Sequence, residues 1–173
     1  MLVAIACLAA GTYGALHNQI SYTICPEYFT QYKFEQFLIQ TDVPDRIGAA
    51  LVGWKAAWWM GLFISSVLIS VGLLFRQKST FFRETLLSYF IVAATTLICG
   101  IAALIYAFIT VDEQSAGQVF RYGNEIIDDV GFVRAGTMHN VSYFGGLAGI
   151  ITVWLRNSLT ANAAVHNRIS IAM

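Results

Sequence analysis

The sequence predicts an all-α, polytopic membrane protein: a bundle of four transmembrane helices that forms one domain over residues 1–173. Three observations lead to this fold class. The chain is 57% hydrophobic and only 12% charged, whereas ordinary globular proteins are roughly 25% charged. Four apolar runs are each long enough to cross a bilayer, and three of them carry regularly spaced small residues. The formal net charge is zero, so there is no basic surface to suit nucleic acid.

The four apolar runs define the expected spans. A helix needs about 20 mainly apolar residues to cross a hydrocarbon core about 30 Å thick. We therefore expect spans at about 2–24, 48–75, 85–110 and 137–155, of which only the second contains a charged residue, Lys55. The first run lacks the basic start and the ordinary cleavage site of a signal peptide, so we expect it to be retained as a helix.

The connections predict the orientation. We expect two outer loops, about 25–47 and 111–136, an inner hairpin at 76–84, and a cytoplasmic tail at 156–173. The hairpin "RQKSTFFR" and the tail together hold five Lys and Arg residues, against four in the two loops, and three of the five lie in the short hairpin. Because short cytoplasmic connections are enriched in Lys and Arg, this bias predicts that both termini are cytoplasmic.

The two outer loops are expected to be partly helical. In the first, Pro26 can begin a helix, and the following "EYFTQYKFEQFLIQ" is rich in aromatic residues. Such a stretch should lie flat on the bilayer surface or roof the bundle. In the second, the pattern favours a short helix at about 116–129.

Small residues at spacings of four let helix backbones approach closely in a membrane. They predict that the first and fourth helices contact each other through Ala10/Gly14 and Gly145/Gly149. The complete set of expected packing residues is Ala10, Gly14, Gly53, Gly61, Gly145 and Gly149.

Two stretches far apart in the chain are nearly identical: "HNQISY" at residues 17–22 and "HNVSY" at 139–143. The first span ends on the side where the fourth begins, so His17 and His139 should lie at the same membrane level. Residues four apart share a helix face, which places Tyr13 and Tyr143 one turn from these histidines, toward the membrane centre.

This arrangement suggests a transition-metal site on the outer side. Imidazole is a common ligand of zinc, copper and iron, usually with carboxylate or thiolate partners. The candidate ligands are His17, His139, Glu27 and Cys25. Side chains that could orient them by hydrogen bonding are Tyr13, Tyr143, Asn18 and Asn140. No local metal-binding motif such as HExxH or CxxC accompanies them.

Other interpretations remain open. His, Asn, Ser and Tyr all suit the membrane interface, so the cluster could be purely structural. The pair recurs as His166-Asn167 in the tail, which shows that the pair alone does not define a site. Two histidines on facing helices could also hold haem, and interfacial aromatic residues suit a quinone. A noncatalytic accessory or assembly subunit, alone or in a homo-oligomer, needs nothing beyond the packing faces.

The words "HNQISYTICPEYF", "GAALVGWKAAWW" and "MHNVSYFGG" resemble a family of uncharacterised bacterial membrane proteins, over most of the chain. The resemblance implies a small four-helix protein of the bacterial inner membrane. It implies no catalytic residue and no assigned function.

Overall fold

Every regular element in the described part of the chain is a helix, which confirms the all-α prediction. The computed structural model describes residues 1–117 and 126–172, with side chains as far as residue 162. The elements are α1 (Leu2–Ile24), the π-helix η1 (Phe29–Lys33), α2 (Phe34–Gln36), α3 (Asp45–Gly72), α4 (Lys78–Thr110), α5 (Glu113–Ala116) and α6 (Asp129–Ala172). The helix expected at about 116–129 falls mostly on residues outside this description.

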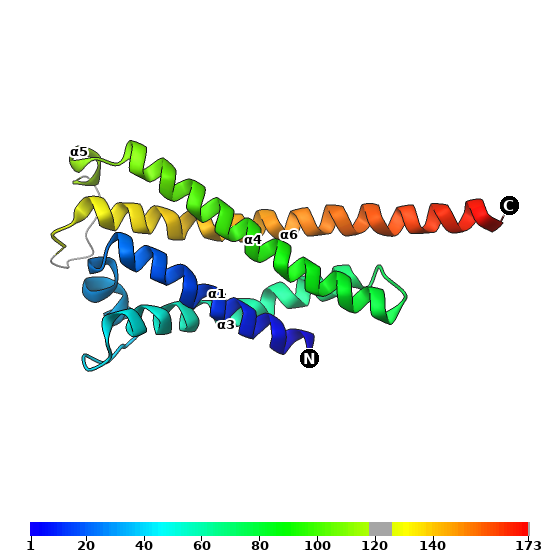
Figure 1. Ribbon diagram of the computed structural model, residues 1–173, viewed down its shortest axis with the longest axis horizontal. Helices are drawn as coiled ribbons and strands as arrows, with labels where there is room; N and C mark the ends of the chain where they lie inside the picture. Colours follow the sequence, from blue (N-terminus) through cyan, green and yellow to red (C-terminus); the bar gives the residue numbers. More distant parts are fainter. Residues whose placement is uncertain (118–125, 173) are drawn as a thin grey trace.

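Two of the long helices, α4 and α6, extend beyond the spans expected from the sequence. Helix α1 coincides with the first expected span, but α4 begins inside the expected hairpin, and α6 begins before its span and continues through the tail. In Figure 1, the C-terminal half of α6 extends well beyond the other helices. The reason is that no proline or glycine interrupts residues 150–172 after Gly149, and leaving an apolar layer does not by itself end a helix.

Two helix pairs make up the bundle. Helix α1 packs along α3, and α4 packs along α6, whereas contacts between the two pairs are much sparser. In Figure 1, the blue α1 runs beside the cyan α3, and the green α4 crosses the yellow and orange α6.

Small residues create both pairs, but not in the combination predicted from the sequence. Gly14 lies directly against the backbone of Gly53, and Gly61 lies against the backbone of α1 at Ala6 and Cys7. On the other pair, a Cβ added at Gly145 would lie 2.7 Å from Cys99 Cβ, and one added at Gly149 would lie 2.9 Å from Val92 Cα.

The prediction that Ala10/Gly14 packs on Gly145/Gly149 is therefore wrong. The physical reason is that large side chains, His17 and His139 among them, occupy the space between α1 and α6. Backbones can meet closely only where both helices offer small residues at the same level, as α1 and α3 do. Ala10 instead lines a cavity between the pairs.

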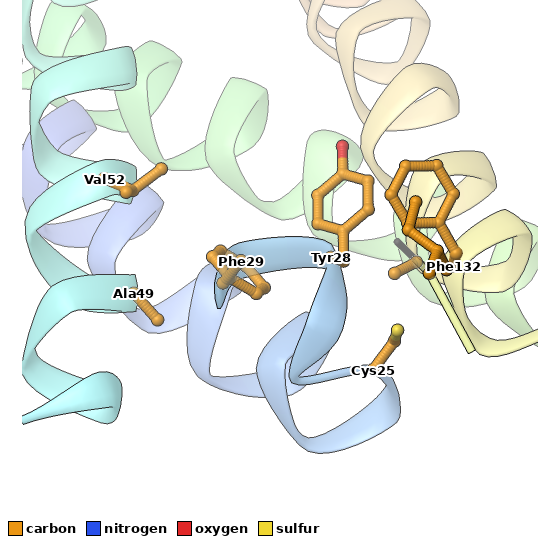
Figure 2. Packing of buried hydrophobic residues seen from close by; sticks show 8 residues of the cluster. Cys25, Tyr28, Phe29, Ala49, Val52 and Phe132 are labelled. Atoms are coloured by element: carbon orange, nitrogen blue, oxygen red, sulfur yellow. The ribbon is translucent and has the colours of Figure 1, made fainter. Parts of the chain in front are cut away.

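The segment 25–44, here called the roof, closes one end of the bundle. Its side chains Cys25, Tyr28 and Phe29 are buried and form one cluster with α3 and α6. Figure 2 shows Phe29 directed toward Ala49 and Val52 of α3, while Tyr28 lies beside Phe132. Of the two placements expected for this aromatic stretch, the structure therefore has the one over the bundle.

The opposite end, here called the hairpin end, is fixed by a buried carboxylate. The Glu84 side chain is 5% exposed and forms ion pairs with Arg83 and Arg156, both at 2.8 Å. Beside it, the fully buried Asn157 donates to Ser88 Oγ at 3.3 Å. These contacts join α4 to α6 where no glycine pair does.

By length and apolar composition, two of the described helices could cross a membrane, α3 and α4. Only 28% of the apolar window of each is buried inside the molecule. The His-Asn pairs lie in the other two long helices, α1 and α6, and their polar side chains lower the local hydropathy there.

Candidate functional site

The two histidines of the repeated words meet beneath the roof. His17 lies on α1 and His139 on α6, and their ring centroids are 4.8 Å apart at an interplanar angle of 73°. The sequence-based expectation that these residues share one level is consistent with this position. They form one of the contacts between the two helix pairs.

His17 is held by a hydrogen bond across the bundle. Its Nε2 lies 3.1 Å from Ser142 Oγ on α6. The Ser142 hydroxyl donates its own proton to the carbonyl of Met138 at 2.8 Å. His17 Nε2 must therefore carry a hydrogen and act as the donor, since a hydroxyl has only one proton to give.

A glycine on α4 makes room for this contact. A Cβ at Gly100 would collide with Ser142 Oγ and would lie 3.6 Å from His17 Nε2. Three helices thus define the position of the His17 ring. Sequence reasoning did not single out Gly100, because it belongs to none of the glycine ladders.

His139 has a different environment. Its ring stacks on Tyr28 of the roof, with centroids 5.1 Å apart and an interplanar angle of 21°. Its Nε2 is buried, and no described residue forms a hydrogen bond with it. A buried polar atom without a partner costs free energy, so this nitrogen is available for a ligand.

The two tyrosines expected beneath the histidines differ from each other. Tyr13 lies beside His17, with ring centroids 5.7 Å apart. Its hydroxyl is buried and makes no hydrogen bond of ordinary length and angle within the described residues, although Ser142 lies close to it. Tyr143 is half exposed and lines the cavity between the two helix pairs.

The two asparagines differ in their relation to the histidines: the Asn18 side chain lies within hydrogen-bonding reach of His17, whereas no described contact joins Asn140 to His139. Asn18 is buried and donates to the carbonyl of Ala49 at 2.9 Å, which ties α1 to α3. Asn140 is exposed and lines the cavities beside the roof. The near-identity of the two words therefore does not give their residues equivalent roles.

The remaining expected metal ligands are engaged elsewhere. Glu27 Oε2 accepts hydrogen bonds from the backbone N–H groups of Ile127 at 2.8 Å and Asp128 at 2.9 Å, just before α6. Cys25 is fully buried in the roof cluster, with its sulfur shown in Figure 2. Burial raises the pKa of the Cys25 thiol to about 11, so it stays protonated at neutral pH, whereas metals bind thiolates.

In the part of the chain that the structure describes, the four expected ligands do not form a metal site. Among the described residues, no three His, Cys, Asp or Glu side chains lie close enough together to hold a metal ion. The physical reason is that Glu27 serves as an anchor between the roof and the start of α6, while Cys25 serves as core.

An apolar cavity of about 290 Å³ lies between the helix pairs, with the histidines at its polar end. Small-molecule sites commonly measure about 300–1,000 Å³, so this cavity is at the lower end of that range. Most of its wall is small and apolar, including Ala6, Ala9, Ala10, Ala56, Ala57 and Ala93. Its polar lining includes Tyr13, His17, Tyr28, Lys33, His139 and Ser142. We call it the main cavity.

A second cavity of about 220 Å³ adjoins it under the roof, lined by Tyr28, Tyr32, Phe132 and Thr137 among others. Lys33 and Asn140 line both cavities. Lys33 was not among the sequence-predicted site residues. The signal that could have identified it is a single lysine within an aromatic stretch expected to roof the bundle.

Comparison of the chain with protein-family models, with curated protein sequences and with solved structures finds no match. The geometry of the two cavities and the histidine pair is therefore the basis for a functional assignment.

Proposed function

We propose that this chain is a four-span protein of the bacterial inner membrane with both termini in the cytoplasm. The apolar surface of the long helices supports their placement in a bilayer. Large hydrophobic side chains are exposed on each of them, including Leu16 on α1, Phe63 on α3, Phe90 on α4 and Phe144 on α6. Soluble monomers rarely expose apolar patches of such extent. In a bilayer, the same side chains contact lipid chains, which are equally apolar.

Within that setting, we propose that the main cavity binds an amphiphilic molecule from the lipid phase, with its polar head beneath the roof. The observation that carries this proposal is a set of buried atoms without hydrogen-bond partners in residues that line this largely apolar cavity: His139 Nε2 and Tyr13 Oη beneath the roof, and Tyr89 Oη on α4. A few convergent polar groups in an apolar pocket are typical of small-molecule sites. A quinone is one molecule of this class.

Binding can be measured on the purified protein in lipid nanodiscs. The probes are laurate, dodecanol and a short-chain quinone with a decyl tail, each tested for a saturable increase in melting temperature. A ligand present at 100 times its Kd stabilises the folded state by about 2.7 kcal/mol. At least one probe should give this increase in the wild-type protein.

Two variants of α4 distinguish cavity binding from partition into lipid. Ala93→Phe fills the main cavity and should abolish the stabilisation. Ala102→Phe adds the same ring to an exposed position of the same helix and should preserve it. If no probe stabilises the protein, or if both variants respond like the wild type, the proposed binding function is wrong.

A transition metal at the histidine pair is the second candidate, and one distance favours it. Two imidazoles bound to one tetrahedral ion have ring centroids about 5 Å apart, because each metal–nitrogen bond is about 2 Å long. The observed 4.8 Å fits this value. Two axial imidazoles on opposite faces of a haem would be about 6 Å apart by the same bond length, so the pair fits haem less well.

Elemental analysis of the purified protein tests the metal. A bound ion should appear at stoichiometric amount and be absent from a His17→Ala, His139→Ala double variant that still folds. Metal-free protein that zinc, copper and iron fail to stabilise, with no Soret band, would eliminate both metal and haem. If the amphiphiles fail as well, an accessory or assembly role in a membrane complex is the interpretation that remains.

A further inference from the structure

Lys33 is a charged side chain placed between the two cavities. It ends the π-helix η1 and lines both the main and the second cavity. Its Nζ lies 4.5 Å from the ring centroid of Tyr32 and 5.6 Å from that of Tyr28. It donates a hydrogen bond to the neutral amide oxygen of Gln36 at 2.9 Å.

This ammonium has no carboxylate partner within the described part of the chain. By contrast, Arg83 and Arg156 both form ion pairs with Glu84 at the hairpin end. Among the described residues that line either cavity, Lys33 alone is formally charged. Partial burial lowers the pKa of Lys33, which reflects the cost of holding a cation away from water without a counter-ion.

Aromatic contacts connect Lys33 to the unpartnered histidine. The ammonium lies over the Tyr28 ring, that ring stacks on His139, and His139 contacts His17. The polar end of the main cavity is therefore one continuous group of side chains. Lys33 and Tyr13 offer N–H and O–H donors there, and the described lining of this cavity contains no carboxylate.

The apolar wall runs away from this end along α1. It includes residues from Asn18 back to Ala6, a helical length of about 18 Å at about 1.5 Å per residue. Small side chains, such as Ala9, Ala10 and Ala56, line this stretch. An apolar wall of this length can contact one extended alkyl chain along the helix.

We propose that the ligand is a single-chain amphiphile with an anionic head, held by the Lys33 ammonium, with its chain along the alanine-lined wall of the main cavity. This inference rests on the proposed binding function and narrows its ligand class. A carboxylate or phosphate head only accepts hydrogen bonds, which matches the donors at this end. A free fatty acid supplies the first head and a single-chain phospholipid the second.

The test compares heads on one chain length. Laurate, dodecyl phosphate, dodecanol and methyl laurate are titrated at pH 8 into nanodiscs of neutral lipid that contain the protein. One or both anions should bind the wild-type protein at least tenfold more tightly than the two neutral compounds. The anion with the lower Kd identifies the head, carboxylate or phosphate.

Variants at two lysines assign the effect to its source. Lys33→Met keeps the approximate length of the side chain but removes its charge, and should weaken anion binding at least tenfold and dodecanol binding by a clearly smaller factor. Lys33→Arg should retain most of the affinity. Lys55→Met is the matched control, because Lys55 is exposed, lines neither cavity and should not affect binding.

The possible failures are distinguishable. Equal binding of anions and neutral compounds in the wild-type protein overturns the anionic head, whatever the stability of the variants, and leaves the proposed binding function intact. A selective loss in Lys55→Met rather than Lys33→Met overturns the assignment to Lys33. Absence of binding by every compound overturns both the head and the binding function.

Discussion

Gly14 of α1 packs directly against Gly53 of α3, and Gly53→Ala is the most direct test of the pairing. A Cβ at Gly53 would collide with the carbonyl of Gly14 and would lie 2.8 Å from the amide nitrogen of Ala15. These are backbone atoms, so no side-chain rotation can relieve the collision. The two helices would have to separate along their contact.

The expected magnitude comes from two opposing effects. Overpacking typically costs about 1–3 kcal/mol, and a collision with backbone should fall at the upper end. Alanine is better than glycine within a helix by about 1 kcal/mol. We therefore expect Gly53→Ala to lower the free energy of unfolding by about 2 kcal/mol.

The matched control is Gly146→Ala on α6. Its added Cβ would have Thr96 Oγ1 as its nearest described neighbour, at 3.5 Å, an ordinary contact. This variant should equal the wild type in stability or exceed it by up to about 1 kcal/mol. Reversible unfolding in mixed micelles of detergent and SDS, followed by circular dichroism, provides the measurement. Wild-type stability in Gly53→Ala, or equal losses in both variants, would refute the pairing of α1 with α3.

Three further predictions concern other parts of the molecule. Glu84→Gln removes the buried carboxylate that both ion pairs share and leaves Arg156, whose side chain is 34% exposed, without its partner; it should destabilise the protein by about 1–3 kcal/mol, whereas Arg83→Gln should cost less than about 1 kcal/mol because that side chain is 77% exposed, and chemical denaturation that gives equal losses would count against the burial of Glu84. Burial raises the pKa of the Cys25 thiol to about 11. The stability gained by burying the neutral thiol should therefore be complete below pH 9 and be lost as pH rises toward 11. A protein with Cys25 as its only cysteine should react slowly with maleimide at pH 7 until it is unfolded. Gln77→Cys, in a background without other cysteines, should be labelled only from the cytoplasmic side of sealed vesicles, and labelling from the outer side would reverse the proposed orientation.

The sequence predicted the helices better than their partners. Apolar runs predicted the positions of α1, α3 and α4 and of the middle part of α6, and the antiparallel course of the chain predicted that His17 and His139 share one level. The glycine ladders identified which helix faces pack, but spacing alone does not say which other helix each face meets. That choice depended on the large side chains between α1 and α6, whose positions no local pattern encodes.

The roof shows a second limit of sequence reasoning. In an α-helix, Lys33 would follow Phe29 by one turn and share its buried face. The structure has a π-helix there, in which the N–H of Phe34 bonds the carbonyl of Phe29. Because this turn contains one residue more than an α-helical turn, Phe34 rather than Lys33 lies one turn after Phe29, and the two phenylalanine rings have centroids 6.4 Å apart. A period of 3.6 residues per turn therefore does not describe the position of Lys33, which lines both cavities.

The pairing of α1 with α3 and of α4 with α6 also bears on biosynthesis. Each tight pair joins long helices that follow one another in the order of translation, so the N-terminal pair has all of its glycine contacts before the C-terminal pair is made. The sparse contacts between the pairs, and the cavity they enclose, can form only after α6 has been synthesised. Two polypeptides divided at the hairpin should therefore reassemble when co-expressed, and recovery of each half only as an aggregate would show that the pairs are not independent folding units.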